Sequence, residues 1–276
     1  MRRVLLTLLL GLTAAAALAF LLLPILALFV HTSPGRLVSQ LSSDVVKDAF
    51  VVSLKTSLIA QLLILAFGTP TAYLIATRRF PGRTLAVTLV ELPLVLPPAV
   101  AGIGLLAAFG RMGLLGSELQ ALGITLPFTQ SAVVVAVAFV ASPLYVRAAI
   151  AAFEGVDPDL VAASRTLGVS SSRTFARVVL PLARAGLAAG LALSFARGLG
   201  EFGATIMFAG SLQGVTQTLP LAIYAQFDLD FDAAVAMSAV LVLVSVVLLV
   251  SLRLLLSWQS SSSTRSLFRF GLSTSG

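Results

Sequence analysis

The stretch at residues 195–210 reads FARGLGEFGATIMFAG and places closely spaced glycines in an apolar setting. Gly198, Gly200 and Gly203 have the G-x-G-x-x-G spacing of a dinucleotide-binding turn. Such a turn needs a preceding strand and a following helix within a soluble βαβ unit. Here the three glycines lie inside a long apolar segment, so the spacing does not predict a nucleotide site.

The composition indicates an integral membrane protein. Of the 276 residues, 58% are hydrophobic and 11% are charged, whereas roughly 25% are charged in an ordinary soluble domain. The mean hydropathy is +1.05. The chain contains no cysteine and a single histidine, His31, which excludes disulfides and thiolate metal sites and argues against a histidine-based metal site.

Six apolar stretches predict an all-α integral membrane protein with six transmembrane helices. A bilayer core of about 30 Å needs roughly 20 helical residues, and a helix pairs its own backbone groups in lipid. Prolines within these stretches predict kinks in the helices. The stretches are residues 4–30, 51–76, 84–109, 130–146, 183–208 and 233–252, and the prolines are Pro70, Pro93, Pro97, Pro98 and Pro143. The first stretch follows Met-Arg-Arg like a signal peptide, but it exceeds a signal core of about 7–15 residues, so we expect it to be retained as a spanning helix.

The distribution of basic residues predicts the orientation, because cytoplasmic loops are enriched in lysine and arginine. With both termini in the cytoplasm, the inner side holds thirteen of the 18 basic residues and the outer side holds four. The net charge of +7 is therefore a topology signal and does not indicate a nucleic-acid partner. We treat residues 1–276 as one transmembrane domain with a Ser-rich cytoplasmic tail at 257–276. The inner residues are Arg2, Arg3, Arg78, Arg79, Arg83, Arg147, Arg165, Arg173, Arg177, Arg184, Arg253, Arg265 and Arg269.

Two charges in the fifth stretch require an explanation, since a charge at that depth costs at least about 2.5 kcal/mol on insertion scales. Arg197 and Glu201 are four residues apart and would share one face of a helix. They can form a structural ion pair, or they can contribute to a gate on the transport path. Gly198, Gly200 and Gly203 would allow close helix packing beside them.

The longest predicted cytoplasmic loop, at residues 153–182, is expected to form two short helices. Asp157 is a suitable N-cap residue, and Pro158 suits the first helical position. Gly168 suits the left-handed position that ends a helix. A second helix at 173–179 would be closed by Pro181. The periodicity alone is that of an ordinary amphipathic surface loop, and a docking element is the alternative.

The second half of this loop resembles the "EAA" loop of ABC-importer permeases, whose pattern is E-A-A-x3-G-x9-I-x-L-P. Gly168 is followed by nine residues, Val178, one residue and then Leu180-Pro181. Ala162, Ala163 and Ser164 occupy the first three positions, so the glutamate of the pattern is absent, and Val178 replaces the isoleucine. The resemblance implies that this loop inserts into an ATP-binding subunit. The residues it assigns to coupling are Asp159, Ala162, Ala163, Ser164, Arg165, Gly168, Val178, Leu180 and Pro181.

Further segments resemble the molybdate permease branch of this class. They read ELPLVLPPAVAGIGLL, GRMGLLG, FEGVDPDLVAASRTLG, FARGLGEFGATIMFAG and TQTLPLAIY, in that order along the chain. Sulfate and thiosulfate permeases share similar segments and remain an alternative. The resemblance implies an inner-membrane permease of a prokaryote that works as a homodimer. Two ATP-binding subunits would dock from the cytoplasm, and an extracytoplasmic oxyanion-binding protein would deliver the substrate.

The chain itself is expected to be a non-catalytic transport subunit. The sequence contains no G-x4-G-K-[ST] motif, so ATP and Mg²⁺ would be bound by the partner subunit, and we expect this chain to bind no cofactor and no metal. A secondary transporter or channel is the alternative from another class. That class predicts inverted repeats and several buried ionisable groups, and the sequence shows one intramembrane pair and no such repeat.

Overall fold

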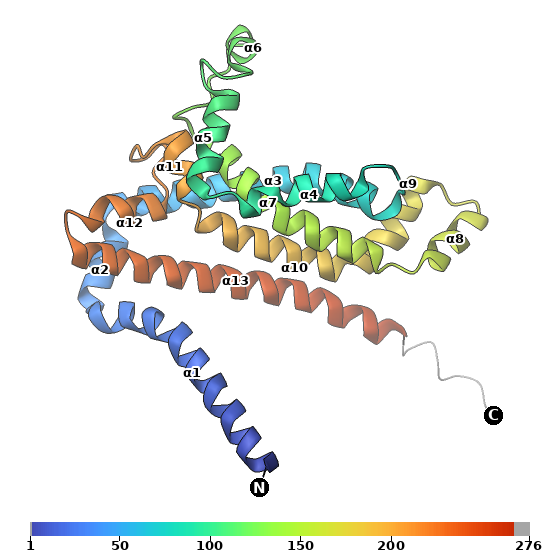
Figure 1. Cartoon of the computed structure of the whole chain (residues 1–276), viewed down its shortest axis with the longest axis horizontal. Helices are drawn as coiled ribbons and strands as arrows, with labels where there is room; N and C mark the ends of the chain where they lie inside the picture. Colours follow the sequence, from blue (N-terminus) through green and yellow to red (C-terminus); the bar gives the residue numbers. More distant parts are fainter. Residues whose placement is uncertain (1, 268–276) are drawn as a thin grey trace.

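The computed structural model describes residues 2–267, and all regular structure within them is helical (Figure 1). The long elements are α1 (Arg2–His31), α3 (Asp44–Thr77), α7 (Gln130–Glu154), α10 (Leu180–Leu199) and α13 (Phe231–Leu267). The intermediate ones are α4 (Arg83–Val95) and α5 (Pro98–Phe109). The short ones are α2 (Pro34–Ser42), α6 (Gly116–Ala121), α8 (Pro158–Thr166), α9 (Ser171–Thr174), the π-helical turn η1 (Phe175–Val179), α11 (Gly203–Ala209) and α12 (Leu219–Phe227).

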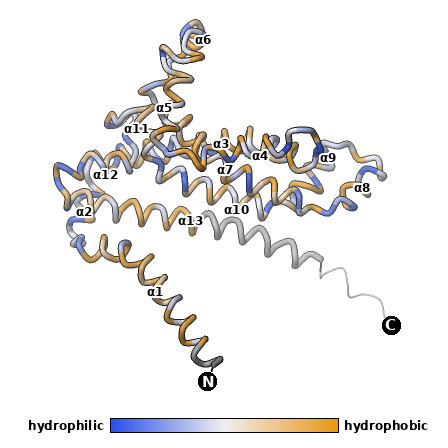
Figure 2. The backbone as a smooth tube through the Cα atoms, viewed as in Figure 1, coloured by the Kyte–Doolittle hydropathy of each residue, from blue (hydrophilic) through white to orange (hydrophobic). Residues whose placement is uncertain are grey.

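Five helical segments of the described chain are long and apolar enough to cross a membrane, or six if the bent pair α4–α5 is one span. This agrees with the prediction of an all-α membrane protein. The first predicted stretch forms α1, whose leucines are largely exposed, as expected for a helix that faces lipid. Figure 2 shows that apolar residues dominate α1 and the described part of α13.

The third predicted stretch was expected to be kinked by its prolines, but it is broken into two helices, with a bend of 114° between α4 and α5. Leu96 and Pro97 are extended, with ψ of 133° and 134°. The residue before a proline is disfavoured in the α region, and a proline inside a helix loses a hydrogen bond. Two successive prolines, Pro97 and Pro98, therefore break the helix, whereas the single Pro70 and Pro143 stay inside α3 and α7.

The predicted fifth spanning helix is also interrupted. α10 ends at Leu199, and α11 begins at Gly203. Gly200 is the C-cap residue of α10, and the two residues that follow it are not helical. The predicted helical continuity between Arg197 and Glu201 is therefore wrong.

The prediction that Pro181 ends a second loop helix is wrong. The helix that starts at Ser171 continues to Leu199 and contains the π-helical turn η1. The amide of Leu180 donates to the carbonyl of Phe175, five residues earlier. A proline clashes with the carbonyl four residues before it. The wider π turn directly before Pro181 accommodates the proline, so the helix continues past it.

The core of the fold is formed by α3, α7 and α10, which pack along one another (Figure 1). Small residues bring these helices close together. A Cβ atom added to Gly190 would lie 2.7 Å from the Cβ of Ala148, and one added to Gly186 would lie 2.5 Å from that of Ala152. Close backbone approach at small residues is the usual basis of helix packing in lipid.

Polar side chains in this core satisfy one another across the helices. The buried side chains of Gln61 on α3 and Ser194 on α10 exchange hydrogen bonds of 2.8 and 3.0 Å. The Thr69 hydroxyl lies 2.7 Å from the Tyr145 hydroxyl on α7. Because the bilayer interior offers no water, such pairs prevent the cost of unsatisfied polar groups.

Candidate functional site: the α8 loop and the Arg197–Glu201 pair

The loop helix α8 begins as the sequence predicts. The Asp157 carboxylate accepts a hydrogen bond of 2.9 Å from the backbone amide of Asp159, and Pro158 occupies the first helical position. The amides at the start of a helix have no partner inside it, and an aspartate cap satisfies one of them. The start of α8 is therefore defined by local chemistry.

The end of α8 is a Schellman motif centred on Gly168. The amide of Gly168 donates to the carbonyl of Arg165 at 3.0 Å, and the amide of Val169 donates to that of Ser164 at 3.2 Å. Gly168 has φ of +76°, and a Cβ atom placed there would meet nothing within 4 Å. The predicted left-handed position is confirmed, and glycine is favoured there by the backbone conformation alone.

α8 is exposed and lies at one end of the molecule, beyond the ends of α3, α7 and α10 (Figure 1). None of its residues is buried. Leu160 is 48% exposed, and Leu167, which follows the helix, is 82% exposed. Ala162 and Ala163 are also exposed. The described chain thus presents an uncovered helix with exposed apolar residues at the end of the core helices.

Side-chain contacts that no sequence pattern predicted hold this loop to the core. The Ser164 hydroxyl lies 3.0 Å from the hydroxyl of Thr174, which is buried on α9. Phe175 of η1 packs against Tyr73 of α3 and Phe153 of α7, with ring centroids 4.8 and 6.1 Å away. No sequence motif links these residues, because they are brought together by the crossing of three helices.

The remaining loop residues of the EAA-like pattern lie where η1 meets α10. Val178 is half-buried, whereas Leu180 and Pro181 are exposed on the first turn of α10. Asp159 and Arg165 are exposed on α8. The residues of the pattern thus form two groups, one on the surface helix and one on the segment that joins it to the core.

The intramembrane pair is formed across the break between α10 and α11. The guanidinium of Arg197 lies 2.7 Å from one carboxylate oxygen of Glu201. The other oxygen accepts a hydrogen bond of 2.8 Å from the amide of Ala204, in the first turn of α11. The side chain of Glu201 is 1% exposed and that of Arg197 is 33% exposed. Each charge also has a favourable sign for its helix end, positive at a C-terminus and negative at an N-terminus.

Only two of the three glycines nearby are closely packed within the chain. A Cβ atom at Gly203 would lie 2.5 Å from the Cβ of Pro98 on α5, and one at Gly198 would lie 2.9 Å from a methyl group of Val137 on α7. A Cβ atom at Gly200 would meet nothing nearer than 4.0 Å. The packing prediction for Gly200 is therefore wrong within this chain, since Gly200 lies at the exposed end of α10.

Comparison with known proteins identifies the family. The family model for the inner membrane component of binding-protein-dependent transport systems matches residues 68–262. The chain belongs to this family. The match includes both the α8 loop and the intramembrane pair, and it leaves out α1 and α2. As a family member, the chain is a multi-pass inner-membrane protein.

Curated relatives of this family member cover most of its length. The molybdenum transport system permease protein ModB of Mycobacterium tuberculosis is 44% identical over 84% of this chain and 88% of that protein. ModB of Escherichia coli is 46% identical over 64% of this chain and 78% of that protein. The sulfate transport system permease protein CysT of Salmonella typhimurium is 36% identical over 86% and 87% of the two chains.

Among solved structures, a bacterial ABC transporter involved in the import of the acidic polysaccharide alginate has a similar fold. One of its chains superposes with a TM-score of 0.66 at 18% identity, covering 93% of this chain and 96% of that one. A second structure of a bacterial alginate ABC transporter, in complex with a pentasaccharide-bound periplasmic protein, gives a TM-score of 0.68 at 19% identity and covers 91% and 93% of the two chains. At these identities the likeness concerns the fold alone.

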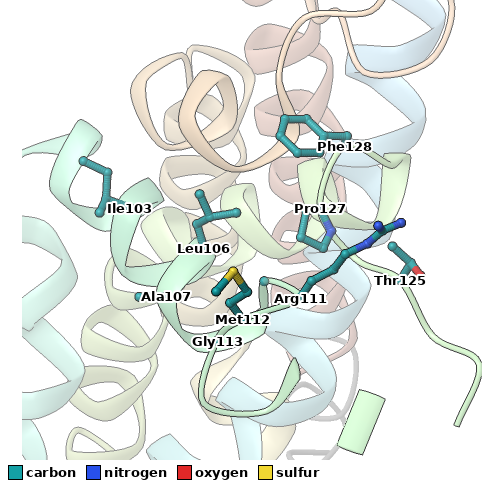
Figure 3. Close-up of a pocket in the computed structure, with 10 residues that line it drawn as sticks. Ile103, Leu106, Ala107, Arg111, Met112, Gly113, Thr125, Pro127 and Phe128 are labelled. Carbon is teal, nitrogen blue, oxygen red and sulfur yellow. The ribbon is translucent and has the colours of Figure 1, made fainter. Parts of the chain in front are cut away.

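This permease also has a cavity of about 770 Å³ at the end of α5 (Figure 3). Arg111 is the one charged residue of its lining, which also includes Pro127 and Phe128. Phe128 has φ of +62°, a strained backbone conformation for an aromatic residue. No sequence pattern predicted this cavity.

Proposed function

We propose that this chain is the permease subunit of an ATP-driven ABC importer and forms the path for molybdate or tungstate. Two copies would form the path, two ATP-binding subunits would dock at the α8 end, and an extracytoplasmic oxyanion-binding protein would dock at the opposite end. The observation that carries the proposal is the similarity to ModB, a molybdenum permease protein, along most of both chains.

The α8 loop is suited to transmit force from a docked ATPase. α8 is itself exposed, so a partner can grip it. Its two connections lead to α7 on one side and, through α9 and η1, to α10 on the other. Rigid capping at Asp157 and Gly168 would let the helix move as a unit, and the Ser164–Thr174 contact would pass that motion to α10. Rigid-body motion of packed helices is a common route to alternating access.

The proposed orientation places α8 in the cytoplasm together with both termini. It follows from the arginine-rich connections at residues 78–83 and 165–184, which both lie at the α8 end of the helix core. In this orientation α6 and the segment that precedes α12 face the outside. The binding protein would approach from that side.

We propose further that the chain hydrolyses no ATP and binds no cofactor. The sequence has no phosphate-binding G-x4-G-K-[ST] loop. ATP and Mg²⁺ would be held by the docked subunit. ATP hydrolysis in that subunit would act on this chain by displacing α8.

The Arg197–Glu201 pair is proposed to be structural, with a gate role as the alternative. Glu201 is buried, neutralised by Arg197 and bonded to the start of α11, so it is not available as a ligand. A free carboxylate would also repel an oxyanion. The pair would hold the broken segment between α10 and α11 in one geometry. Substrate selection would then reside mainly in the binding protein.

ATPase stimulation of the assembled complex tests this function. The complex of this chain with its ATP-binding subunit is placed in liposomes, and ATP hydrolysis is measured with the binding protein loaded with molybdate, tungstate or sulfate. We expect molybdate and tungstate to stimulate hydrolysis and sulfate to do so poorly. Stimulation by sulfate alone would support the second candidate, a sulfate permease, which the similarity to CysT favours. Failure to assemble with any ATPase would contradict the importer function itself.

A further inference from the structure

A long groove runs along the α8 half of α3. Its volume is about 1650 Å³. It extends from Leu62 to Thr77 on α3 and continues onto α8 and η1. At 1.5 Å per residue, this part of α3 is about 22 Å long, which exceeds half the thickness of a bilayer core of about 30 Å.

The two ends of this groove differ in chemistry. The inner part is lined by aliphatic and aromatic side chains, and its mouth beside α8 is lined by arginines. Apolar lining residues include Leu62, Leu65, Ala66, Tyr73, Phe153 and Phe175. The arginines at the mouth are Arg78, Arg79, Arg83 and Arg165.

Two of these arginines, Arg78 and Arg79, are available to a ligand, whereas Arg165 belongs to α8, where the ATPase would dock. Arg83 forms an ion pair with Glu154 and donates a 2.9 Å hydrogen bond to the carbonyl of Ile75, so it is engaged within the chain. Among the described residues, no carboxylate lies within ion-pair distance of Arg78, Arg79 or Arg165, and all three are exposed. The mouth of the groove thus carries an excess of positive charge next to an apolar trough.

We propose that this groove binds one anionic phospholipid, with its phosphate at Arg78 and Arg79 and an acyl chain along α3. Basic clefts between membrane helices at the cytoplasmic surface are suited to anionic headgroups. The proposal rests on the proposed orientation, which puts the arginines at the inner leaflet. Because α8 and η1 line the same groove, the bound lipid would brace the docking helix against α3.

Two other occupants fit the groove less well. A free oxyanion would pair with the arginines but leave the apolar trough, about 22 Å along α3, without a ligand. A second copy of this chain, related by two-fold symmetry, would bring like surfaces together and place unpaired arginines near one another. A phospholipid matches both parts of the groove at once.

The test measures phospholipid retained by the purified full-length chain. The protein is extracted from membranes containing equal amounts of phosphatidylglycerol and phosphatidylcholine, washed in detergent, and its bound lipid is quantified by mass spectrometry. We expect at least a tenfold preference for phosphatidylglycerol. The R78Q/R79Q variant should lower this retention roughly 30-fold, given the usual gain per basic residue at an anionic surface. R173Q/R177Q removes two exposed arginines of the same cytoplasmic region that do not line the groove, and it should retain lipid as the wild type does.

A second pair of variants distinguishes a lipid from a free anion. Ala66→Trp fills the apolar trough and should abolish lipid retention, while Thr71→Trp, at an exposed position of α3 that does not line the groove, should not. Displacement of the lipid by millimolar phosphate or molybdate in the wild type would overturn the proposal in favour of an anion site. Equal retention in R78Q/R79Q and R173Q/R177Q would also overturn it. None of these measurements involves ATP or transport, so they can fail while the importer function stands.

Discussion

Glu201 joins two helices by binding both Arg197 and the amide of Ala204. Its carboxylate lies 2.7 Å from the guanidinium at the end of α10 and 2.8 Å from the first-turn amide of α11. The charge of Glu201 is buried, whereas a third of the Arg197 side chain is exposed. Removal of either partner therefore leaves the other in a different environment, and this asymmetry leads to the first prediction.

Arg197→Met should destabilise the protein more than Glu201→Gln. The first variant leaves a buried, uncompensated carboxylate, which typically costs about 3–5 kcal/mol. The second keeps an acceptor for the Ala204 amide and leaves a cation that can reach the surface. The double variant should recover most of the loss, measured as thermal stability in detergent. A gate role predicts a different result, namely stable single variants in which ATP hydrolysis no longer depends on substrate.

The second prediction concerns the end of α8. Gly168→Val should destabilise the loop, because a β-branched residue in the left-handed region costs of order 1–2 kcal/mol. We expect the protein to insert normally but to stimulate its ATPase poorly. Gly155→Val is the matched control, since Gly155 has φ of −76° and is exposed. Gly168→Asn should retain more coupling than Gly168→Val, because asparagine tolerates this conformation. Wild-type coupling in Gly168→Val would remove the turn from the mechanism.

The third prediction separates the glycines of the G-x-G-x-x-G spacing. Gly203→Ala should lower stability by about 1–3 kcal/mol, because the new methyl group would overlap Pro98. Gly200→Ala should change stability by less than about 0.5 kcal/mol, since open space surrounds it. The melting temperatures of the two purified variants are compared with that of the wild type. Equal losses would show that Gly200 packs against something outside this chain.

The fourth prediction concerns orientation. The chain has no native cysteine, so a single introduced one reports cleanly. Cysteine at Glu118 on α6 should react with a membrane-impermeant thiol reagent from outside, and cysteine at Ser171 on α9 should react only after the cells are opened. Both positions are exposed, which makes them matched reporters. Labelling of the Ser171→Cys variant in intact cells would reverse the proposed topology.

The sequence predicted the parts of this fold that depend on local chemistry. Apolar length predicted the membrane helices, and the caps at Asp157 and Gly168 were predicted because each residue acts within one helix turn. The pairing of Arg197 with Glu201 was also predicted, although for the wrong reason, since the four-residue spacing assumed an unbroken helix. A glycine such as Gly200 permits either close packing or a helix end, and spacing alone does not distinguish these.

Features that depend on tertiary contacts were not predictable from the sequence. The prolines predicted kinks, but the position of α5 after the 114° bend, packed against α11, involves residues far apart along the chain. The Ser164–Thr174 contact and the Phe175 cluster require residues from separate elements to meet. The arginine-lined groove likewise combines α3, α8 and η1. In each case the side chain can be read from the sequence, but its contact partner depends on how the helices cross.

ATP-dependent uptake of molybdate into proteoliposomes tests the central claim most directly. The liposomes contain this chain and its ATP-binding subunit, with ATP enclosed and the loaded binding protein outside. We predict uptake of molybdate that requires ATP and is lost in the Gly168→Val variant but not in Gly155→Val. Uptake of sulfate without uptake of molybdate would contradict the assigned substrate, and uptake of molybdate that persists without ATP or the ATP-binding subunit would contradict the importer mechanism.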